Sequence, residues 1–371
     1  MTTYSTQRPL GMAEFTALTP DERVRAAQGS RGTAGFAETV RILLMLGRPR
    51  TCVPGLLAFS LGWTVAGPAF DWRYVLGLFL TLVYGLIANL YNAHTDLEED
   101  SRNLPGRVWL LLRAGDRRVV AAGHLLSVAV LACAPLYGWD YIAAAVISLI
   151  GAHQYSYPPL RLKARPVAGL FAFSLAVFRP FVLGYFAGPH GVRAPDAEGW
   201  ALIGFLIVWF VAKGMVKNLP DHDGDRAAGL RTSATVFPDR ASAARAATAM
   251  TLVGYLSLPL LVLGGALPAL TLLALPWAVL AYLQCRAMAK APDAAAANQV
   301  LKRDMLLSTA FLATLLVLTE PGWATAVAVA LGAAVLLGSD RVALDSRRSQ
   351  DVRNRPADGP APAPARKETA A

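Results

Sequence analysis

Ten long apolar runs constrain this chain more than any other feature of its sequence. They lie near residues 50–67, 74–92, 119–137, 140–157, 166–187, 199–217, 246–264, 267–285, 304–319 and 322–338. A helix needs roughly 20 predominantly apolar residues to cross a bilayer, and most of these runs approach or reach that length. The last two runs are short and are joined by Glu320, Pro321 and Gly322. We therefore expect nine or ten transmembrane helices.

A large soluble helical protein is the competing interpretation of these runs. Charged residues make up only 16% of the 371, and the mean hydropathy is +0.42, whereas a soluble domain carries about 25% charged residues. The runs are also apolar on every helix face, while a surface helix shows a single apolar stripe. We therefore predict an all-α, multi-pass transmembrane helical bundle over residues 37–338. Residues 1–36 should form a polar cytoplasmic tail, and residues 339–371 a disordered one.

The placement of the basic residues predicts the orientation in the membrane. If the N-terminus is cytoplasmic and successive runs cross, 31 of the 35 Lys and Arg residues fall on one side and two on the other. An excess of Lys and Arg marks the cytoplasmic side of a membrane protein. This distribution accounts for the net charge of +10 without a nucleic-acid partner. We expect a cell-membrane protein whose N-terminus and C-terminus are both cytoplasmic.

An acidic segment follows the second apolar run. Asn92, Asp96 and Asp100 are spaced four residues apart, so on a continuing helix they share one face, about 6 Å apart along the axis. Carboxylates at that spacing repel one another unless a cation lies between them. Mg²⁺ suits such a site, because it binds one or two carboxylates, several waters and phosphate oxygens.

A second acidic segment follows the sixth run and repeats the spacing with Asp221 and Asp225, adding Asp223 between them. An EF-hand does not fit, because Gly224 precedes the third Asp and a closing Glu is absent. Ordinary solvated loops at helix ends remain the alternative for either segment alone. Two such segments on the same predicted membrane face, both flanked by cations, favour paired magnesium sites.

Basic residues surround both acidic segments and complete a diphosphate site, because Lys and Arg contact phosphate oxygens directly. The candidates are Arg107, Arg161, Lys163, Lys217, Arg226 and Arg231. Lys213 precedes Lys217 by one helical turn and faces either the same cavity or the membrane interface. Arg179 lies more than halfway across the fifth run, where a charged residue is a functional candidate, with a role that the sequence leaves open.

The chain resembles the UbiA-type intramembrane prenyltransferases over residues 40–320. Three motifs carry the resemblance, in order: Asn92-Ala93-x2-Asp96-x3-Asp100, the segment from Tyr155 to Lys163, and the segment from Lys217 to Thr232. The family pattern continues through Asn103, Pro105 and Arg107. Ala93 and Asn218 replace an Asp of that pattern, and the tenth apolar run exceeds the usual nine helices.

The resemblance implies a bundle with a lipid-side tunnel that both acidic loops cap. It implies that Asn92, Asp96, Asp100, Asp221 and Asp225 bind Mg²⁺, and that a prenyl diphosphate loses pyrophosphate. It also implies that Tyr155 and Asp223 join the cations in holding the substrate. We expect the acceptor to be an aromatic small molecule dissolved in membrane lipid. Two alternatives remain: a terpene cyclase of the same fold, and a non-catalytic lipid-binding or transport protein.

Overall fold

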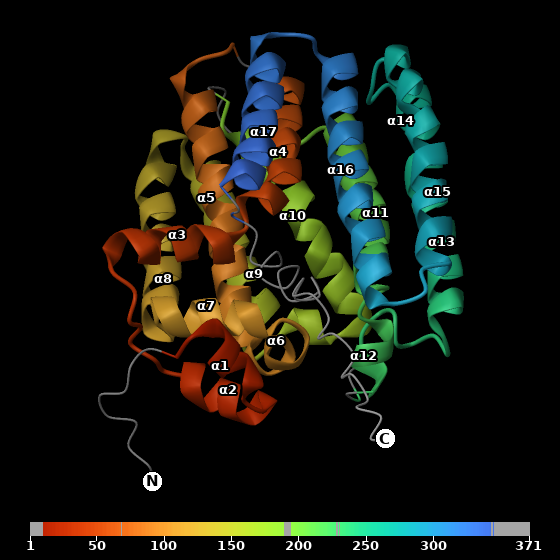
Figure 1. Cartoon of the computed structure of the whole chain (residues 1–371). Coiled ribbons are helices and arrows are strands. Elements are labelled where there is room, and N and C mark those ends of the chain that lie inside the picture. The colour runs from red at the N-terminus through yellow and green to blue at the C-terminus, as the bar shows by residue number, and fades with distance from the viewer. Residues whose placement is uncertain are drawn as a thin grey trace, which may run out of the picture.

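The computed structural model describes residues 10–67, 69–188, 194–227, 229, 231–342 and 344, and every regular element in these residues is helical. The longer helices stand side by side in a bundle (Figure 1). They are α4 (Val53–Val65), α5 (Trp72–Thr95), α8 (Asp116–Cys133), α9 (Trp139–Ser156), α10 (Pro166–Phe186), α11 (Ala197–Asn218), α13 (Arg240–Leu256), α15 (Pro276–Ala289), α16 (Ala294–Thr319) and α17 (Trp323–Arg341). The predicted all-α class is confirmed.

Seven helical stretches in the described residues are long and apolar enough to cross a membrane. An eighth is a pair bent by 43°, in which α3 (Phe36–Gly47) is followed by η1 (Pro49–Cys52) and α4. Short elements extend three of the stretches: η2 (Ala134–Leu136), α14 (Leu258–Leu263) and η4 (Ala269–Ala274). Helices α9 and α16 fall outside this set. The count of nine or ten spans is therefore not confirmed.

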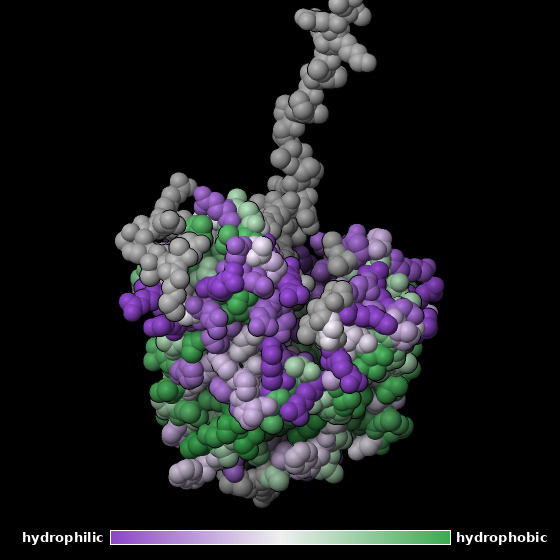
Figure 2. All heavy atoms as spheres, turned by 90° about the horizontal axis from the view of Figure 1, so that it is seen from below, coloured by the Kyte–Doolittle hydropathy of each residue, from purple (hydrophilic) through white to green (hydrophobic). Residues whose placement is uncertain are grey.

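The outer face of the bundle is apolar, as expected for contact with lipid. The stretch that contains α8 is the most apolar in the set, yet only 22% of it is buried. Leu125 and Val128 on this helix are 71% and 62% exposed. Seen from below, hydrophilic side chains gather over one end of the molecule, and hydrophobic residues form its flanks (Figure 2). The chain is a membrane protein.

Helices α4 and α10 lie in direct contact at the centre of the bundle. A Cβ atom added to Gly62 would lie 2.0 Å from the carbonyl oxygen of Phe181, and one added to Gly184 would lie 1.9 Å from that of Phe59. Glycine at both positions therefore lets the two backbones meet, as small residues do in membrane helix pairs. This contact fixes two neighbouring helices that both line the cavity described below.

Shorter helices cover the lower end of the bundle in Figure 1. They are α6 (Leu97–Asn103) and α7 (Pro105–Ala114) after α5, η3 (Leu162–Ala164) after α9, and α12 (His222–Ala227) after α11. Pro105 occupies the first turn of α7, where its missing N–H costs no helical hydrogen bond. The loops that carry both acidic segments therefore lie at one end of the molecule.

The segment predicted as a polar tail, residues 1–36, is folded in its described part. Residues 10–36 include α1 (Met12–Ala17) and α2 (Pro20–Ala27), and Phe15 and Ala27 are fully buried. The Arg23 guanidinium donates to the carbonyl oxygen of Ser101 in α6 at 2.6 Å. The segment thus packs on the first acidic loop, because its few apolar residues fall on one face. Of the predicted tail 339–371, residues 339–341 complete α17, and residue 343 and residues 345–371 lie outside the described residues.

Candidate active site

The first acidic loop begins where α5 ends. Asp96 has φ −94° and ψ 17°, so the helix breaks there, in contrast to the continuing helix that the spacing predicted. The backbone N–H of Asp96 still donates to Asn92 at 3.0 Å, and that of Asp100 donates to Asp96 at 2.7 Å. These bonds keep the three residues one turn apart, so the break does not separate them.

Cations from two other segments contact these carboxylates. The Lys163 ammonium in η3 bonds to Asp96, and the Arg107 guanidinium lies 2.6 Å from the Asp100 carboxylate. Arg161 forms an ion pair with Glu99 of α6 at 2.8 Å. The segment from Tyr155 to Lys163 thus docks on the first acidic loop although more than fifty residues separate them in the chain.

The second acidic loop lies at the same end of the bundle as the first (Figure 1). Burial raises the pKa of Asp225 to about 6, and the negative charges of Asp221 and Glu99 add to this effect, while a hydrogen bond from Thr232 opposes it. Glu99 belongs to α6, so negative charge of the first loop acts on the second. A cation between them would relieve this repulsion.

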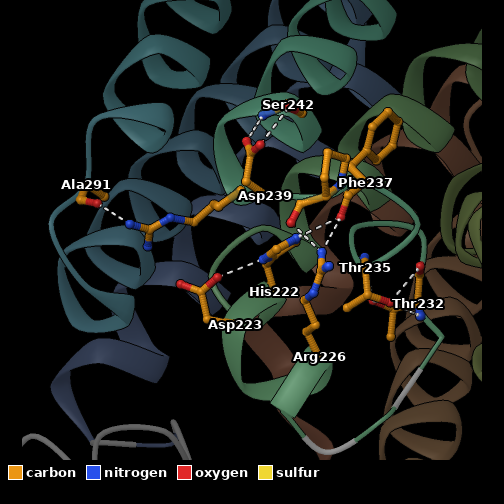
Figure 3. A network of polar contacts seen from close by, with 11 residues as sticks. His222, Asp223, Arg226, Thr232, Thr235, Phe237, Asp239, Ser242 and Ala291 are labelled. Carbon is orange, nitrogen blue, oxygen red and sulfur yellow. Dashed lines mark hydrogen bonds and ion pairs between the residues drawn. The ribbon is translucent and has the colours of Figure 1, made fainter.

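The outer side of the second loop is held by a separate network (Figure 3). His222 is buried and lies 2.7 Å from the Asp223 carboxylate. The Arg226 guanidinium donates to the carbonyl oxygens of Phe237, at 3.1 Å, and Pro238. These contacts tie α12 to the start of α13. Asp223, Arg226 and Arg231 are exposed and do not line the cavity, so their predicted substrate contacts stay predictions.

A cavity of about 210 Å³ runs into the bundle beside the first loop. Asn92, Tyr155 and Lys217 line its mouth among the predicted site residues. Its deeper walls are mostly apolar and come from α4, α5, α10, α11, α16 and α17. Lys217 lies over the Phe173 ring, 4.9 Å from its centroid, at the boundary between the polar mouth and the apolar interior.

Lys163 and Lys217 are crowded together near this mouth. Burial and the charge of Lys217 lower the pKa of Lys163 to about 7, despite the ion pair with Asp96. Two ammonium groups at such a place are stabilised by an anion that offers several oxygens. The mouth therefore suits a diphosphate.

Sequence reasoning left one buried ion pair of the cavity wall unassigned. Lys213 of α11 lies 2.8 Å from Asp304 of α16, and both side chains are almost fully buried. Lys213 therefore faces the cavity, which is one of the two placements expected for it. Asp304 is the first residue of the apolar run predicted over 304–319. A charged residue at the start of such a run is the sequence feature that could have identified it as a site residue. Arg48, Arg50 and Asn89 also line the cavity.

The two residues that depart from the family pattern have structural roles. Ala93 is buried and packs in a hydrophobic cluster with Leu90 and Val108. The Asn218 amide donates to the Ser233 hydroxyl at 2.8 Å and ties the second loop together.

The carboxylates of the two acidic loops fit Mg²⁺ better than a metal ion whose ligands all come from protein side chains. Within the described residues, no group of three or more His, Cys, Asp or Glu side chains is arranged to hold a metal. Mg²⁺ needs only one or two carboxylates when phosphate and water supply the remaining ligands. The crowding of Asp225 with Asp221 and Glu99 is the feature that such an ion would relieve.

This fold defines a polytopic membrane protein with an internal, mostly apolar cavity. The family model of the UbiA prenyltransferase family matches residues 52–304. The chain therefore belongs to the UbiA prenyltransferase family and is a prenyltransferase, which confirms the predicted family and class of activity.

Individual relatives agree with this assignment. The chain is 28% identical over 232 residues to a lycopene elongase/hydratase of Corynebacterium glutamicum, a match that covers 61% of this chain and 77% of the relative. It is 27% identical over 256 residues to a digeranylgeranylglyceryl phosphate synthase of Methanothermobacter thermautotrophicus, covering 68% and 87%. The fold is similar to that of a UbiA homologue of Archaeoglobus fulgidus bound to GPP and Mg²⁺. That match has a TM-score of 0.59 and 19% identity, and covers 80% of this chain and 99% of the homologue.

Proposed function

We propose that this prenyltransferase transfers a prenyl group, in a Mg²⁺-dependent reaction, from an isoprenyl diphosphate to the electron-rich π-bond of an acceptor within the membrane. One observation carries the proposal: a mostly apolar cavity that Asn92, Tyr155 and Lys217 line opens beside the first acidic loop, whose Asp96 bonds to Lys163. The Archaeoglobus fulgidus homologue is bound to GPP and Mg²⁺, which supports an isoprenyl diphosphate and Mg²⁺ as the ligands of this chain. The positive-inside distribution supports acidic loops that face the cytoplasm.

The donor diphosphate lies at the cavity mouth. Lys163 and Lys217 donate to its oxygens, and Asn92 and Tyr155 complete the rim. Arg107 is already paired with Asp100, so it holds that carboxylate in place and strengthens the loop. The isoprenyl chain then extends between the apolar walls of α10, α11 and α16.

Asn92, Asp96, Asp100, Asp221 and Asp225 are the residues that would hold Mg²⁺. When bound, the ion neutralises charge that develops on the departing pyrophosphate. Lys163 and Lys217 stabilise the same charge through hydrogen bonds that strengthen as the bond breaks.

The transfer breaks the C–O bond of the allylic diphosphate, and pyrophosphate leaves with the electron pair. The π-electrons of the acceptor form the new C–C bond, and the acceptor then loses a proton. The apolar walls keep water away from the allylic cation, because water would otherwise capture it as an alcohol.

Two acceptor classes supply such a π-bond. The sequence predicts an aromatic ring, whereas the name of the Corynebacterium glutamicum relative indicates lycopene, a neutral polyene. Terpene cyclisation remains the alternative reaction, since it needs the same loops and no acceptor.

Pyrophosphate release from the purified full-length chain separates these possibilities. The assay supplies geranyl diphosphate and Mg²⁺, alone, with a phenol or with lycopene. We expect release that depends on an acceptor, together with a prenylated product. Release with a hydrocarbon product and no acceptor would indicate cyclisation, and no release under any condition would refute both reactions.

A further inference from the structure

Residues 10–36 form a folded segment that precedes the part of the chain matched by the family model, which begins at residue 52. Its helices α1 and α2 pack against the first acidic loop at the lower end of the bundle (Figure 1). They contact α6, which carries Asp100, and α7. The prenyl transfer described above gives this segment no role, yet its contacts fall on both sides of Asp96.

Arg23 of α2 connects the segment to the helix that follows Asp96. Its Nη1 donates to the carbonyl oxygen of Ser101 at 2.6 Å. The same guanidinium donates to the carbonyl oxygens of Phe15, at 3.4 Å, and Thr16. Ser101 lies in the last four residues of α6, whose carbonyl groups have no partner within the helix. Arg23 therefore supplies the hydrogen bond that α6 itself cannot make.

Asp116 of α8 connects the same segment to the helix that precedes Asp96. This carboxylate is 4% exposed, accepts from the backbone N–H of Gly29 at 2.8 Å, and lies 2.5 Å from Nδ1 of His94. The backbone N–H of Asp116 donates to the Ser30 hydroxyl at 3.0 Å. His94 is in the last turn of α5. One buried carboxylate thus holds the segment and the end of α5 together.

Backbone and apolar contacts dock the segment between these two points. The backbone N–H groups of Thr33 and Ala34 both donate to the carbonyl oxygen of Arg113 at 2.9 Å. Phe15 is fully buried and belongs to one hydrophobic cluster with Leu97, the residue that directly follows Asp96. The segment therefore contacts both elements that flank the break in the helix.

The break at Asp96 makes such contacts important. Because the helix is interrupted there, the direction of α6 relative to α5 depends on contacts with other parts of the chain. Asp96 and Asp100 lie on either side of this junction, and a site that is preorganised binds its ligand at lower cost. Groups that hold metal ligands from outside the coordination shell change metal affinity about 10-fold to 100-fold when they are removed.

We infer that the N-terminal segment braces the active site, and that Arg23 and Asp116 are positioning residues that hold α5 and α6 where Asp96 and Asp100 can bind Mg²⁺ and the donor diphosphate. Neither residue is among those that line the cavity in the described structure, so both act through the loop. The inference rests on the proposed Mg²⁺-dependent binding of the donor and adds to it a segment that the family model does not match.

Binding of geranyl thiolodiphosphate to the full-length chain, followed as Mg²⁺ is titrated well below the melting temperature, tests this inference. We expect Arg23→Gln and Asp116→Ala each to raise the Mg²⁺ concentration at half-maximal binding about tenfold. Arg23→Lys keeps the charge and one donor, so it should recover part of this loss. Arg25→Gln removes an exposed charge from the same helix; it is the matched control and should leave the titration unchanged.

The melting temperature of each variant separates positioning from a general loss of stability. A merely structural role would lower the melting temperature and leave the Mg²⁺ titration of the folded protein unchanged, and this result would overturn the inference. Arg23→Gln decides the matter if Asp116→Ala does not fold, because Arg23 is only half-buried. Unmodified protein that binds the analogue without Mg²⁺, or not at all, would instead refute the proposed donor binding.

Discussion

The buried ion pair between Lys213 and Asp304 offers the most quantitative test of the cavity wall. The two side chains are 6% and 3% exposed, and the ammonium nitrogen lies 2.8 Å from the carboxylate oxygen. At an effective dielectric constant of about 20, two unit charges at that distance attract by about 6 kcal/mol. Asp304→Asn removes this attraction and leaves Lys213 charged and buried.

We expect Asp304→Asn to lower the free energy of unfolding by about 3 to 5 kcal/mol, the usual cost of breaking a buried pair from one side. The double variant Lys213→Met/Asp304→Leu should recover most of this loss, because neither charge then remains in the interior. Glu38→Gln is the control, since it breaks a pair with Arg113 that is partly exposed to solvent and should cost at most about 1 kcal/mol.

Unfolding of the purified chain in mixed detergent and SDS measures these differences. The account predicts that the single variant is much less stable than the control and that the double variant lies between them. Equal stability of Asp304→Asn and Glu38→Gln, or a double variant as unstable as the single one, would refute this reasoning.

Three further predictions follow from packing and charge. Leu336 of α17 lines the cavity, so Leu336→Trp should shorten the longest isoprenyl diphosphate that the enzyme accepts, as measured by product chain length. An unchanged range of product lengths would place the isoprenyl chain elsewhere. A Cβ atom at Gly32 would lie 2.2 Å from the carbonyl oxygen of Ala114, so Gly32→Ala should lower the melting temperature, and an unchanged value would show that the N-terminal segment is not docked. Lys163→Gln should reduce the affinity for the diphosphate donor at least tenfold in a binding assay, whereas Arg226→Gln should lower the stability and leave this affinity unchanged. Loss of donor affinity in Arg226→Gln but not in Lys163→Gln would exchange the roles of the two cations.

Patterns in the sequence predicted the features that depend on local composition. Apolar runs predicted the long helices, because any helix that is buried or faces lipid needs apolar residues, whichever helices it packs against. Asp96 and Asp221 each lie four residues, about one helical turn, from another polar residue of the same acidic segment. This spacing can be read from a short stretch of sequence, so it identified both loops. The family resemblance then added the segment from Tyr155 to Lys163.

Contacts between distant segments were not predictable in the same way. The partner of Lys213 is ninety-one residues away in the chain, and no local pattern connects α11 with α16. The described part of the polar N-terminal segment packs on α6 and α7, because a few apolar residues such as Phe15 are buried. The average polarity of the segment did not predict this packing. Arg226 is a candidate phosphate ligand by sequence, but its carbonyl partners, Phe237 and Pro238, become visible only in the folded loop.

The central claim is that the paired acidic loops and the lysines at the cavity mouth bind a prenyl diphosphate through Mg²⁺. Equilibrium binding of geranyl thiolodiphosphate, a donor analogue that resists ionisation, tests it most directly. The account predicts tight binding in Mg²⁺, loss of binding in EDTA, and loss in Asp96→Asn/Asp225→Asn even with Mg²⁺ present. Binding that persists in EDTA, or that is unchanged in the double variant, would contradict it.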